Sequence, residues 1–541
     1  MNPGLCRAAV GGLLALPWLL ALAPGPSANV VPWLTSAACG LAAFALLGGV
    51  PPARRWLLAV AAVVLFVVLR PAEGALDRSA FAAGAALALL AFCVARGCVQ
   101  RGESHVAVIA QAWLAAALVS SVIALLQYFD SAGFLQPWVY PSKVGEAVAN
   151  LRQRNQFASL TTIGLASVLW LAARGPGHWL PWTLPVLLLA VANAATTSRT
   201  GLLQWVVVLG LTLAWAGPAR RRSVLLCVAG LAAYAVASLA LPMLLQQFTG
   251  LGADSLFTRL EADLGCSSRR VLWGNVLQLI AARPLLGWGW GELDYAHYLH
   301  LYGDAARFCD ILDNAHNLPL HLAVELGVPM ALLLSAVVVV GILRATPWRE
   351  KDPSRRLAWT VLAAIGLHSL LEYPLWYGPF QLALGLALGL LATSAGQPLL
   401  PRARGTIAVL GAALIAYAAW DYDRVSQLYL EPDQRRAWWR EETLAHARKS
   451  VLFATQASFA ELTLAPLTRD NARWNDAAAQ ALLHYSPEPR IIERVIESAT
   501  MQERYDDAVL HLARYRAAFP TDSTTWRNAQ KRMPELPVPS R

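Results

Sequence analysis

Residues 313–343, DNAHNLPLHLAVELGVPMALLLSAVVVVGIL, join a polar cluster that contains a histidine to a long, predominantly apolar run. A helix of about 20 such residues spans the hydrocarbon core of a bilayer, so 317–343 is expected to cross a membrane. Ionisable groups at that boundary are costly unless they are solvated, paired or used in function. His316 stands there and can exchange a proton near neutral pH. The stretch therefore predicts a helical membrane protein with a functional group at one face.

The composition of the whole chain agrees with this prediction. The 541 residues are 57% hydrophobic and only 14% charged, whereas soluble domains carry about 25% charged residues. We expect an all-α, polytopic protein with about thirteen transmembrane helices, although one or two tightly joined segments could be re-entrant or merged. The expected spans are 4–23, 30–49, 56–72, 79–97, 106–127, 157–174, 178–196, 201–217, 223–245, 317–343, 357–373, 376–396 and 405–420.

Arginine and lysine are distributed unequally over the loops. With the N-terminus inside, the inner loops hold sixteen of these residues and the short outer loops hold six. Cytoplasmic loops carry such an excess, so the distribution predicts an inside N-terminus and an outside C-terminus. The net charge of +10 then largely reflects topology. No nucleic-acid partner is expected, because no basic patch alternates with aromatic residues in a soluble region.

The first apolar run has an alternative interpretation. Arg7, the run after it and the sequence APGPSA at 23–28 resemble a secretory signal peptide. A retained first helix is favoured, because further spans follow at once and no clear cleavage site stands out. Cleavage would leave the side of every later loop unchanged.

Three regions are expected. Residues 1–150 are N-terminal transmembrane helices, 151–420 form a transmembrane core, and 421–541 form a charged, helical outer domain without a spanning run. The core includes the longest outer loop, 246–316, which is rich in Leu, Trp and Tyr. So much apolar surface disfavours disorder. Helices are expected within this loop at 268–282 and 292–302.

The outer domain shows two helix-period patterns, 489–501 and 502–519. In the second, Ala508, His511, Leu512 and Tyr515 share one face. The pair resembles a tetratricopeptide-type helical hairpin with alanine at the crowded crossing. The alternative is a small helical domain packed on the membrane half, since solenoid repeats need about three copies to stand alone.

The seven cysteines fall into two groups. Five lie in or beside expected spans, and only Cys266 and Cys309 lie in outer polar regions. An oxidising periplasm permits a disulfide between these two, which would restrict the unfolded loop and draw Arg269 toward His316. Two free thiols remain the alternative. No Cys/His spacing indicates zinc.

Three arginines on the outer side are candidates for binding phosphate. Arg199 lies at the mouth of the eighth span, and Arg269 and Arg270 lie in the long loop. Arginine grips phosphate oxygens with a planar fork of donors. Such fixed cations would stabilise the charge that builds on a departing pyrophosphate. The alternatives are a snorkelling side chain for Arg199 and solvated loop charges for the other two.

His316 is a candidate general base for an acceptor hydroxyl, the alternative being a structural histidine at a helix start. His321 points elsewhere on the helix, and Glu325 is expected to be a buried packing or hydrogen-bonding group. A dense polar set at the outer end of the sixth span could hold sugar hydroxyls or phosphate, or could simply cap the helix. The set comprises Gln153, Arg154, Asn155 and Gln156.

Several motifs are missing from the sequence. There is no GxxxxGK[ST] loop for nucleotide hydrolysis, no paired acids inside the spans as in a proton-coupled transporter, and no DxD-type site on the inner face. We therefore expect a protein without metal or other cofactor that is supplied by a lipid-borne substrate.

One ordered series of motifs carries a family resemblance. It comprises QRNQ at 153–156, SRTG at 198–201, Ser268-Arg269 with Trp273, RPLLGWGWG at 283–291, His316-Asn317 with Glu325 and Gly327, and His368 with EYP at 372–374. The chain resembles the O-antigen ligase and polymerase superfamily, and within it the bacterial O-linked oligosaccharyltransferases, or protein glycosylation ligases. The resemblance covers about 150–380. The EYP element and the helical tail favour the protein-modifying branch.

The resemblance implies a metal- and ATP-independent glycosyltransferase of the bacterial inner membrane, with its active site on the periplasmic side. It would move a glycan from an undecaprenyl-pyrophosphate carrier to a Ser or Thr hydroxyl of a secreted protein such as a pilin. His316 matches the essential histidine of the family. Arg199 and one of Arg269 and Arg270, preferably Arg269, match its pyrophosphate-binding arginines. Gln153 or Gln156, and Tyr373, match further positions linked to activity.

Other functions remain open at this point. An O-antigen polymerase or a lipid A-core ligase would use the same donor with another acceptor. A lipid-linked glycan transporter would use the arginines as a binding site and His316 as a proton relay. Against transport, the polar groups cluster at the outer ends of the spans, and no internal repeat of the kind common in transporters is visible.

Overall fold

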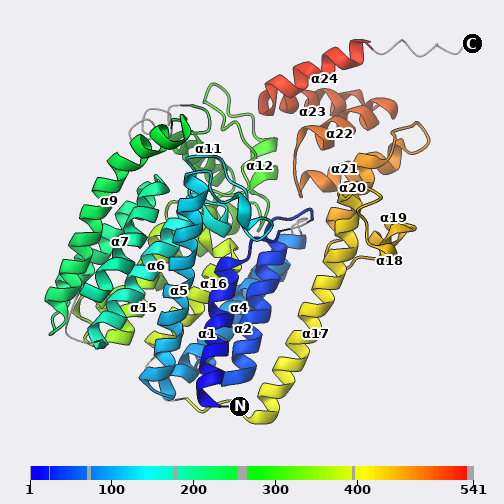
Figure 1. Ribbon diagram of the computed structural model, residues 1–541. Coiled ribbons are helices and arrows are strands. Elements are labelled where there is room, and N and C mark those ends of the chain that lie inside the picture. The colour runs from blue at the N-terminus through cyan, green and yellow to red at the C-terminus, as the bar shows by residue number, and fades with distance from the viewer. Residues whose placement is uncertain are drawn as a thin grey trace, which may run out of the picture.

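The computed structural model describes residues 2–23, 25–69, 75–175, 180–252, 265–392 and 396–532, without the side chains of 75–77 and 530–532. All regular structure among these residues is helical (Figure 1). The first nine helices are α1 (Pro3–Leu19), α2 (Val30–Leu47), α3 (Arg54–Leu69), α4 (Ala75–Gln100), α5 (Glu103–Tyr128), α6 (Arg154–Arg174), α7 (Leu180–Ala195), α8 (Arg199–Ala214) and α9 (Arg220–Thr249).

The second half of the membrane part contains α11 (Arg269–Ala282), α12 (Leu293–Leu299), α13 (Leu318–Leu326), α14 (Val328–Ala345), α15 (Pro353–Ser369), α16 (Gly378–Leu391) and α17 (Pro401–Ser426). A helix occupies every segment in which the sequence predicts a span. Seven helices among the described residues are long and apolar enough to cross a membrane, and four shorter ones are also apolar. The all-helical, multi-span class is therefore confirmed, whereas the number thirteen and the orientation stay predictions.

The expectation of one continuous helix over 317–343 is wrong. The chain breaks between α13 and α14 at Gly327, where φ is +89°. A loop from the long outer segment packs against this break. Its Trp288 amide donates to the Val324 carbonyl at 2.8 Å, and a Cβ on Gly327 would lie 2.2 Å from the Leu285 carbonyl oxygen. The break therefore needs glycine, because a side chain would collide with the loop backbone.

Helix α6 is the centre of the bundle. Almost all of its side chains are buried, and it contacts α5, α7, α8, α9 and α15 (Figure 1). By contrast, α14 and α17 expose apolar side chains such as Val338 and Leu414. A lipid environment would cover these surfaces. Helix α6 thus lies in the protein interior, whereas α14 and α17 lie at the periphery of the bundle.

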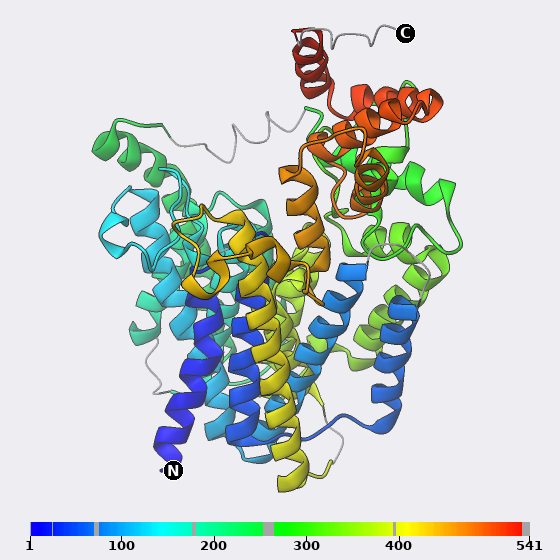
Figure 2. The same ribbon diagram turned by 90° about the vertical axis from the view of Figure 1, so that its right-hand side faces the viewer.

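The C-terminal helices form a separate layer at the end of the bundle that also carries α11 and α12, opposite the N-terminus (Figure 2). They are α18 (Ala437–Arg440), α19 (Thr443–Ala447), α20 (Ala454–Leu464), α21 (Ala472–Leu483), α22 (Pro489–Met501), α23 (Tyr505–Ala518) and α24 (Pro520–Arg532). The expected helices at 489–501 and 502–519 correspond to α22 and α23. Their likeness to a tetratricopeptide hairpin stays a prediction.

Helix α12 connects this layer to the membrane part. Its Tyr298 belongs to the same apolar cluster as the buried side chains of α20 to α23. The Tyr298 hydroxyl lies 2.7 Å from Nδ1 of His511, and Nδ1 of His484 lies 2.6 Å from the carboxylate of Glu292. The expected helices at 268–282 and 292–302 correspond to α11 and the shorter α12, while residues 253–264 of the loop lie outside the described residues.

Candidate active site

The carboxylate of Glu372 is the centre of the candidate site. It accepts hydrogen bonds from Nδ1 of His316 at 2.8 Å, from Nδ2 of Asn155 at 3.2 Å and from Nη2 of Arg269. Glu372 lies beyond the end of α15, and its side chain is only 8% exposed. Four segments that are distant in sequence therefore meet at one acidic group.

The charge of Glu372 follows from its surroundings. Burial alone would raise the pKa of the Glu372 carboxyl, but the hydrogen bond and charge of His316, together with those of Arg269, lower it. The carboxylate is then ionised at neutral pH, so Nδ1 of His316 donates to it. Whenever Nε2 of His316 is unprotonated, its lone pair can accept a proton. Among the described residues, Nε2 has no hydrogen-bond partner.

The backbone around His316 holds the imidazole in place. His316 itself has φ +50°, and its amide donates to the side-chain oxygen of Asn314 at 2.9 Å. Nε1 of Trp273, in α11, donates to the Ala315 carbonyl at 3.1 Å. Asn317 caps α13 and donates to the Leu370 carbonyl at 3.0 Å. The histidine is thus fixed to the helix of Arg269 and to the segment of Glu372.

The structure distinguishes Arg269 from Arg270. Both stand in the first turn of α11, which begins after the Ser268 cap. Arg269 reaches Glu372 with Nη2, while its Nη1 is buried and has no hydrogen-bond partner in the described part of the chain. Arg270 is exposed. Only Arg269 therefore directs an unused, fixed donor into the site.

The QRNQ segment at the start of α6 serves several purposes. Gln153 caps the helix by accepting from the Gln156 amide at 2.8 Å. Arg154 pairs with Glu146 and lies 3.4 Å from the Thr197 hydroxyl. Asn155 contacts Glu372, as described, and Gln156 is buried. Of the two candidate glutamines, Gln156 is the one directed inward, and Gln153 is a capping residue.

Two tyrosines continue the site beyond His316. The ring of Tyr373 meets the His316 ring edge to face, with centroids 5.0 Å apart, and stacks on Tyr377 at 5.9 Å. Tyr377 also lies beside Gln156. The wall thus formed connects the EYP element to the start of α6.

Arg199 opens α8 beside this site. The preceding residue, Ser198, caps the helix and donates to Oδ1 of Asn155 at 2.6 Å. Arg199 itself is exposed. Its helix is therefore tied through Asn155 to Glu372, and its charged side chain stands at the rim.

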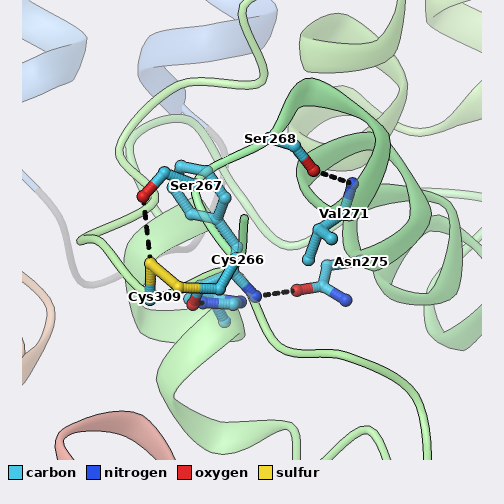
Figure 3. Close-up of a disulfide and its surroundings, with 8 residues drawn as sticks. Cys266, Ser267, Ser268, Val271, Asn275 and Cys309 are labelled. Atoms are coloured by element: carbon cyan, nitrogen blue, oxygen red, sulfur yellow. Dashed lines mark hydrogen bonds between the residues drawn. A yellow bond between two sulfur atoms is a disulfide. The ribbon is translucent and has the colours of Figure 1, made fainter. Parts of the chain in front are cut away.

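Cys266 and Cys309 are joined by a disulfide, with Cα atoms 5.5 Å apart (Figure 3). Beside it, Asn275 of α11 accepts from the Phe308 amide at 2.7 Å and donates to the Ala306 carbonyl at 2.8 Å. These links attach the chain that leads to His316 to the helix that carries Arg269.

Two features of this region were missed by the sequence interpretation. Glu372 entered it only as a letter of the EYP element, because its three partners come from distant segments. The other is the pairing of His321 with Glu325 at 3.2 Å, although the burial of Glu325 was expected. The His321 ring meets Trp290 and Trp376 edge to face. The only signal in the sequence was the i, i+4 spacing of the two residues in an otherwise apolar helix.

Among the residues that the structure describes, no group of three or more His, Cys, Asp or Glu side chains could hold a metal ion. The acidic group at the centre of the site is instead bound by an arginine and a histidine.

The bundle of apolar helices identifies a polytopic membrane protein. Its Arg–Glu–His site is partly buried and lies at the end of the bundle that carries the C-terminal helices. Residues 184–335 match the protein family described as O-Antigen ligase, 147–172 match Protein glycosylation ligase, and 356–534 match Virulence factor membrane-bound polymerase, C-terminal. The resemblance inferred from the motifs is thereby confirmed.

Two curated relatives come from Acinetobacter baylyi (strain ATCC 33305 / BD413 / ADP1). One is named General O-oligosaccharyltransferase and is 26% identical over 291 residues, which is 51% of this chain and 49% of that protein. The other is named ComP-specific O-oligosaccharyltransferase and is 26% identical over 251 residues, which is 46% of this chain and 44% of that protein. The chain thus spans about half the length of the curated relatives it matches.

Proposed function

We propose that the protein is an O-linked oligosaccharyltransferase. It transfers a glycan from an undecaprenyl-pyrophosphate carrier to a Ser or Thr hydroxyl of an exported protein such as a pilin, at the periplasmic face of the bacterial inner membrane. The observation that carries the proposal is the position of Glu372, which binds His316 and Arg269 with the same carboxylate. A base and a cation for the leaving group are thereby held side by side.

In the proposed reaction, Nε2 of His316 takes the proton of the acceptor hydroxyl. The hydroxyl oxygen forms a bond to the anomeric carbon of the glycan as the bond from that carbon to the pyrophosphate oxygen breaks. Undecaprenyl pyrophosphate leaves with the electron pair of that bond. A positioned general base contributes about 10²–10⁴-fold to such a rate. Glu372 fixes the tautomer of the imidazole and stabilises the imidazolium that forms, as the carboxylate of a catalytic triad does.

The arginines act on the leaving group. Nη1 of Arg269 is buried and has no hydrogen-bond partner among the described residues, so its donor is already desolvated and can bind a phosphate oxygen. Arg199 supplies a second cation at the rim. Fixed donors that face developing charge in a site that excludes water stabilise the transition state without reorganisation. Neither step requires ATP or a metal.

The match of 356–534 to a polymerase family supports a second candidate, an O-antigen polymerase. There the same base and cations would act on a hydroxyl of another lipid-linked glycan, and a lipid A-core ligase would use the same chemistry on its own acceptor. Both alternatives leave the donor half of the site unchanged.

The experiment expresses the chain in cells that make a lipid-linked glycan, together with a candidate pilin, and measures the intact mass of the pilin and the length of lipid-linked glycans. A pilin heavier by one glycan supports the proposed function. Longer lipid-linked glycans with unmodified pilin would identify the polymerase instead.

A further inference from the structure

A fully buried group of polar side chains lies about one helical turn inside the site and takes no part in the chemistry above. Gln204 of α8 is at its centre, with Ser159 of α6 and His368 of α15 beside it, and each is at most 1% exposed. Polar side chains are rare inside an apolar bundle and act there as links between helices.

The hydrogen bonds of this group join the three helices. Nε2 of Gln204 donates to the Ala364 carbonyl at 2.9 Å and to the Ser159 hydroxyl at 2.7 Å. Its side-chain oxygen accepts from the Thr162 hydroxyl at 3.1 Å. The Ser159 hydroxyl also hydrogen-bonds to Nδ1 of His368, 2.9 Å away.

The side chain of His368 makes a single hydrogen bond within the described part of the chain, to Ser159. Its Nε2 has no partner there, and its ring meets Phe380 edge to face at 5.5 Å and 82°. Ser159 and Phe380 therefore hold the ring in place.

The three linked helices are the ones that carry site residues at their outer ends. Ser159 follows Asn155 by four residues, Gln204 follows Arg199 by five, and His368 precedes Glu372 by four. In each case the separation is about one helical turn. Hydrogen bonds at the site itself link the same three segments, from Ser198 to Asn155 and from Asn155 to Glu372. Two layers of hydrogen bonds thus join one set of segments.

We infer that the Gln204–Ser159–His368 group is a positioning device for the proposed reaction. It sets the register of α8 against α6 and α15, and so the place of Arg199 relative to Glu372 and His316. The inference rests on the proposed function. It extends the site to residues that touch neither donor nor acceptor, and it matters because a misplacement of about 1 Å can lower a rate about 10²-fold.

The test replaces Ser159 by alanine, which removes one link and leaves the bond from Gln204 to Ala364. Gln204→Leu is less suitable, because it removes three buried hydrogen bonds at once and could prevent folding. Ser167→Ala is the matched control, since that hydroxyl bonds only to Ile163 of its own helix, at 2.9 Å. We expect Ser159→Ala to lower kcat for glycan transfer about tenfold at unchanged membrane abundance, and Ser167→Ala to match the wild type.

A double-mutant cycle with Arg199→Lys separates positioning from general stability. If Ser159 acts through the placement of Arg199, its loss should lower the rate by much less than tenfold in the Arg199→Lys background. The effects of two mutations do not add when the residues act as one unit. Loss of folded enzyme would lower the rate by the same factor in both backgrounds. Equal factors, or wild-type activity of Ser159→Ala, would overturn the inference. Absence of transfer by the wild type would instead reject the proposed function, before any variant is compared.

Discussion

Nδ1 of His316 and the carboxylate of Glu372 lie 2.8 Å apart, although 56 residues separate them in the chain. The same carboxylate binds Arg269 and Asn155. It therefore fixes the orientation of the imidazole and the position of the cation together. A change at Glu372 should disturb both halves of the proposed reaction.

Replacement of Glu372 by glutamine should lower the rate of glycan transfer by about 10²–10⁴-fold, because the neutral amide no longer selects the Nδ1–H tautomer or stabilises imidazolium. The rate per enzyme molecule in isolated membranes checks this. Glu146→Gln is the matched control, since Glu146 pairs with Arg154 and does not touch His316. A similar loss in both variants would point to a general effect of losing a carboxylate in this region.

Arg269→Ala and Arg270→Ala should differ. Arg269 has a buried donor directed into the site, whereas Arg270 is exposed. We expect Arg269→Ala to lower transfer by about 10²-fold and Arg270→Ala to stay within about threefold, since an isolated surface charge contributes little. Titration of the lipid-linked donor against a fixed acceptor distinguishes the two. Equal losses would remove the distinction between these neighbours.

The contact between α12 and the outer layer should weaken in acid. Burial, with the charge of Arg514, lowers the pKa of His511 to about 4 from an ordinary value of 6.5. Between pH 6.5 and about pH 4, His511 is protonated in the unfolded chain but not in the folded chain. The free energy of unfolding therefore falls across that window as the pH is lowered, by up to about 1.4 kcal/mol per pH unit. Above pH 6.5 the group has no such effect.

Thermal unfolding of the purified protein between pH 7.5 and 4 checks this sign. The His511→Gln variant should show a flatter profile, because glutamine does not titrate and can still bond to the Tyr298 hydroxyl. Identical profiles for the wild type and the variant would assign the acid sensitivity to other groups.

The orientation of the bundle can be read with reporter fusions. A reporter that is active only in the periplasm should be active after Arg541 and silent near Arg355, because the Arg and Lys residues concentrate on the side of Arg355. Matched fusions to a reporter that is active only in the cytoplasm should show the opposite. The reverse pattern would move the site to the cytoplasmic face.

Much of the helical layout could be predicted because length and hydropathy of a span are local properties. The break at Gly327 could not, since it depends on Leu285 and Trp288 packing against it from a loop remote in sequence. The central position of Glu372 could not be predicted for the same reason, because its partners at 155, 269 and 316 come together only in the fold. Conversely, Cys266 and Cys309 could be paired in advance because composition left only these two on the outer side.

Local spacing also left pairs of neighbours undecided. Gln153 and Gln156 both suit a helix start, and only the cap geometry shows that Gln153 bonds to the backbone while Gln156 faces Tyr377. Arg269 and Arg270 are adjacent in one turn, and the register of α11 against Glu372 decides between them. The sequence does not predict the buried polar group of Ser159, Gln204 and His368, because each of these residues stands alone in an apolar run.

The most direct test of the account is the His316→Ala variant, assayed by the intact mass of a co-expressed acceptor pilin and normalised to the enzyme in the membrane. His300→Ala, in the same outer loop, is the control. We expect His316→Ala to insert normally, because the side chain is 26% exposed and leaves little cavity, and to lose at least about 10²-fold in transfer. Transfer at the wild-type rate would contradict the proposed base.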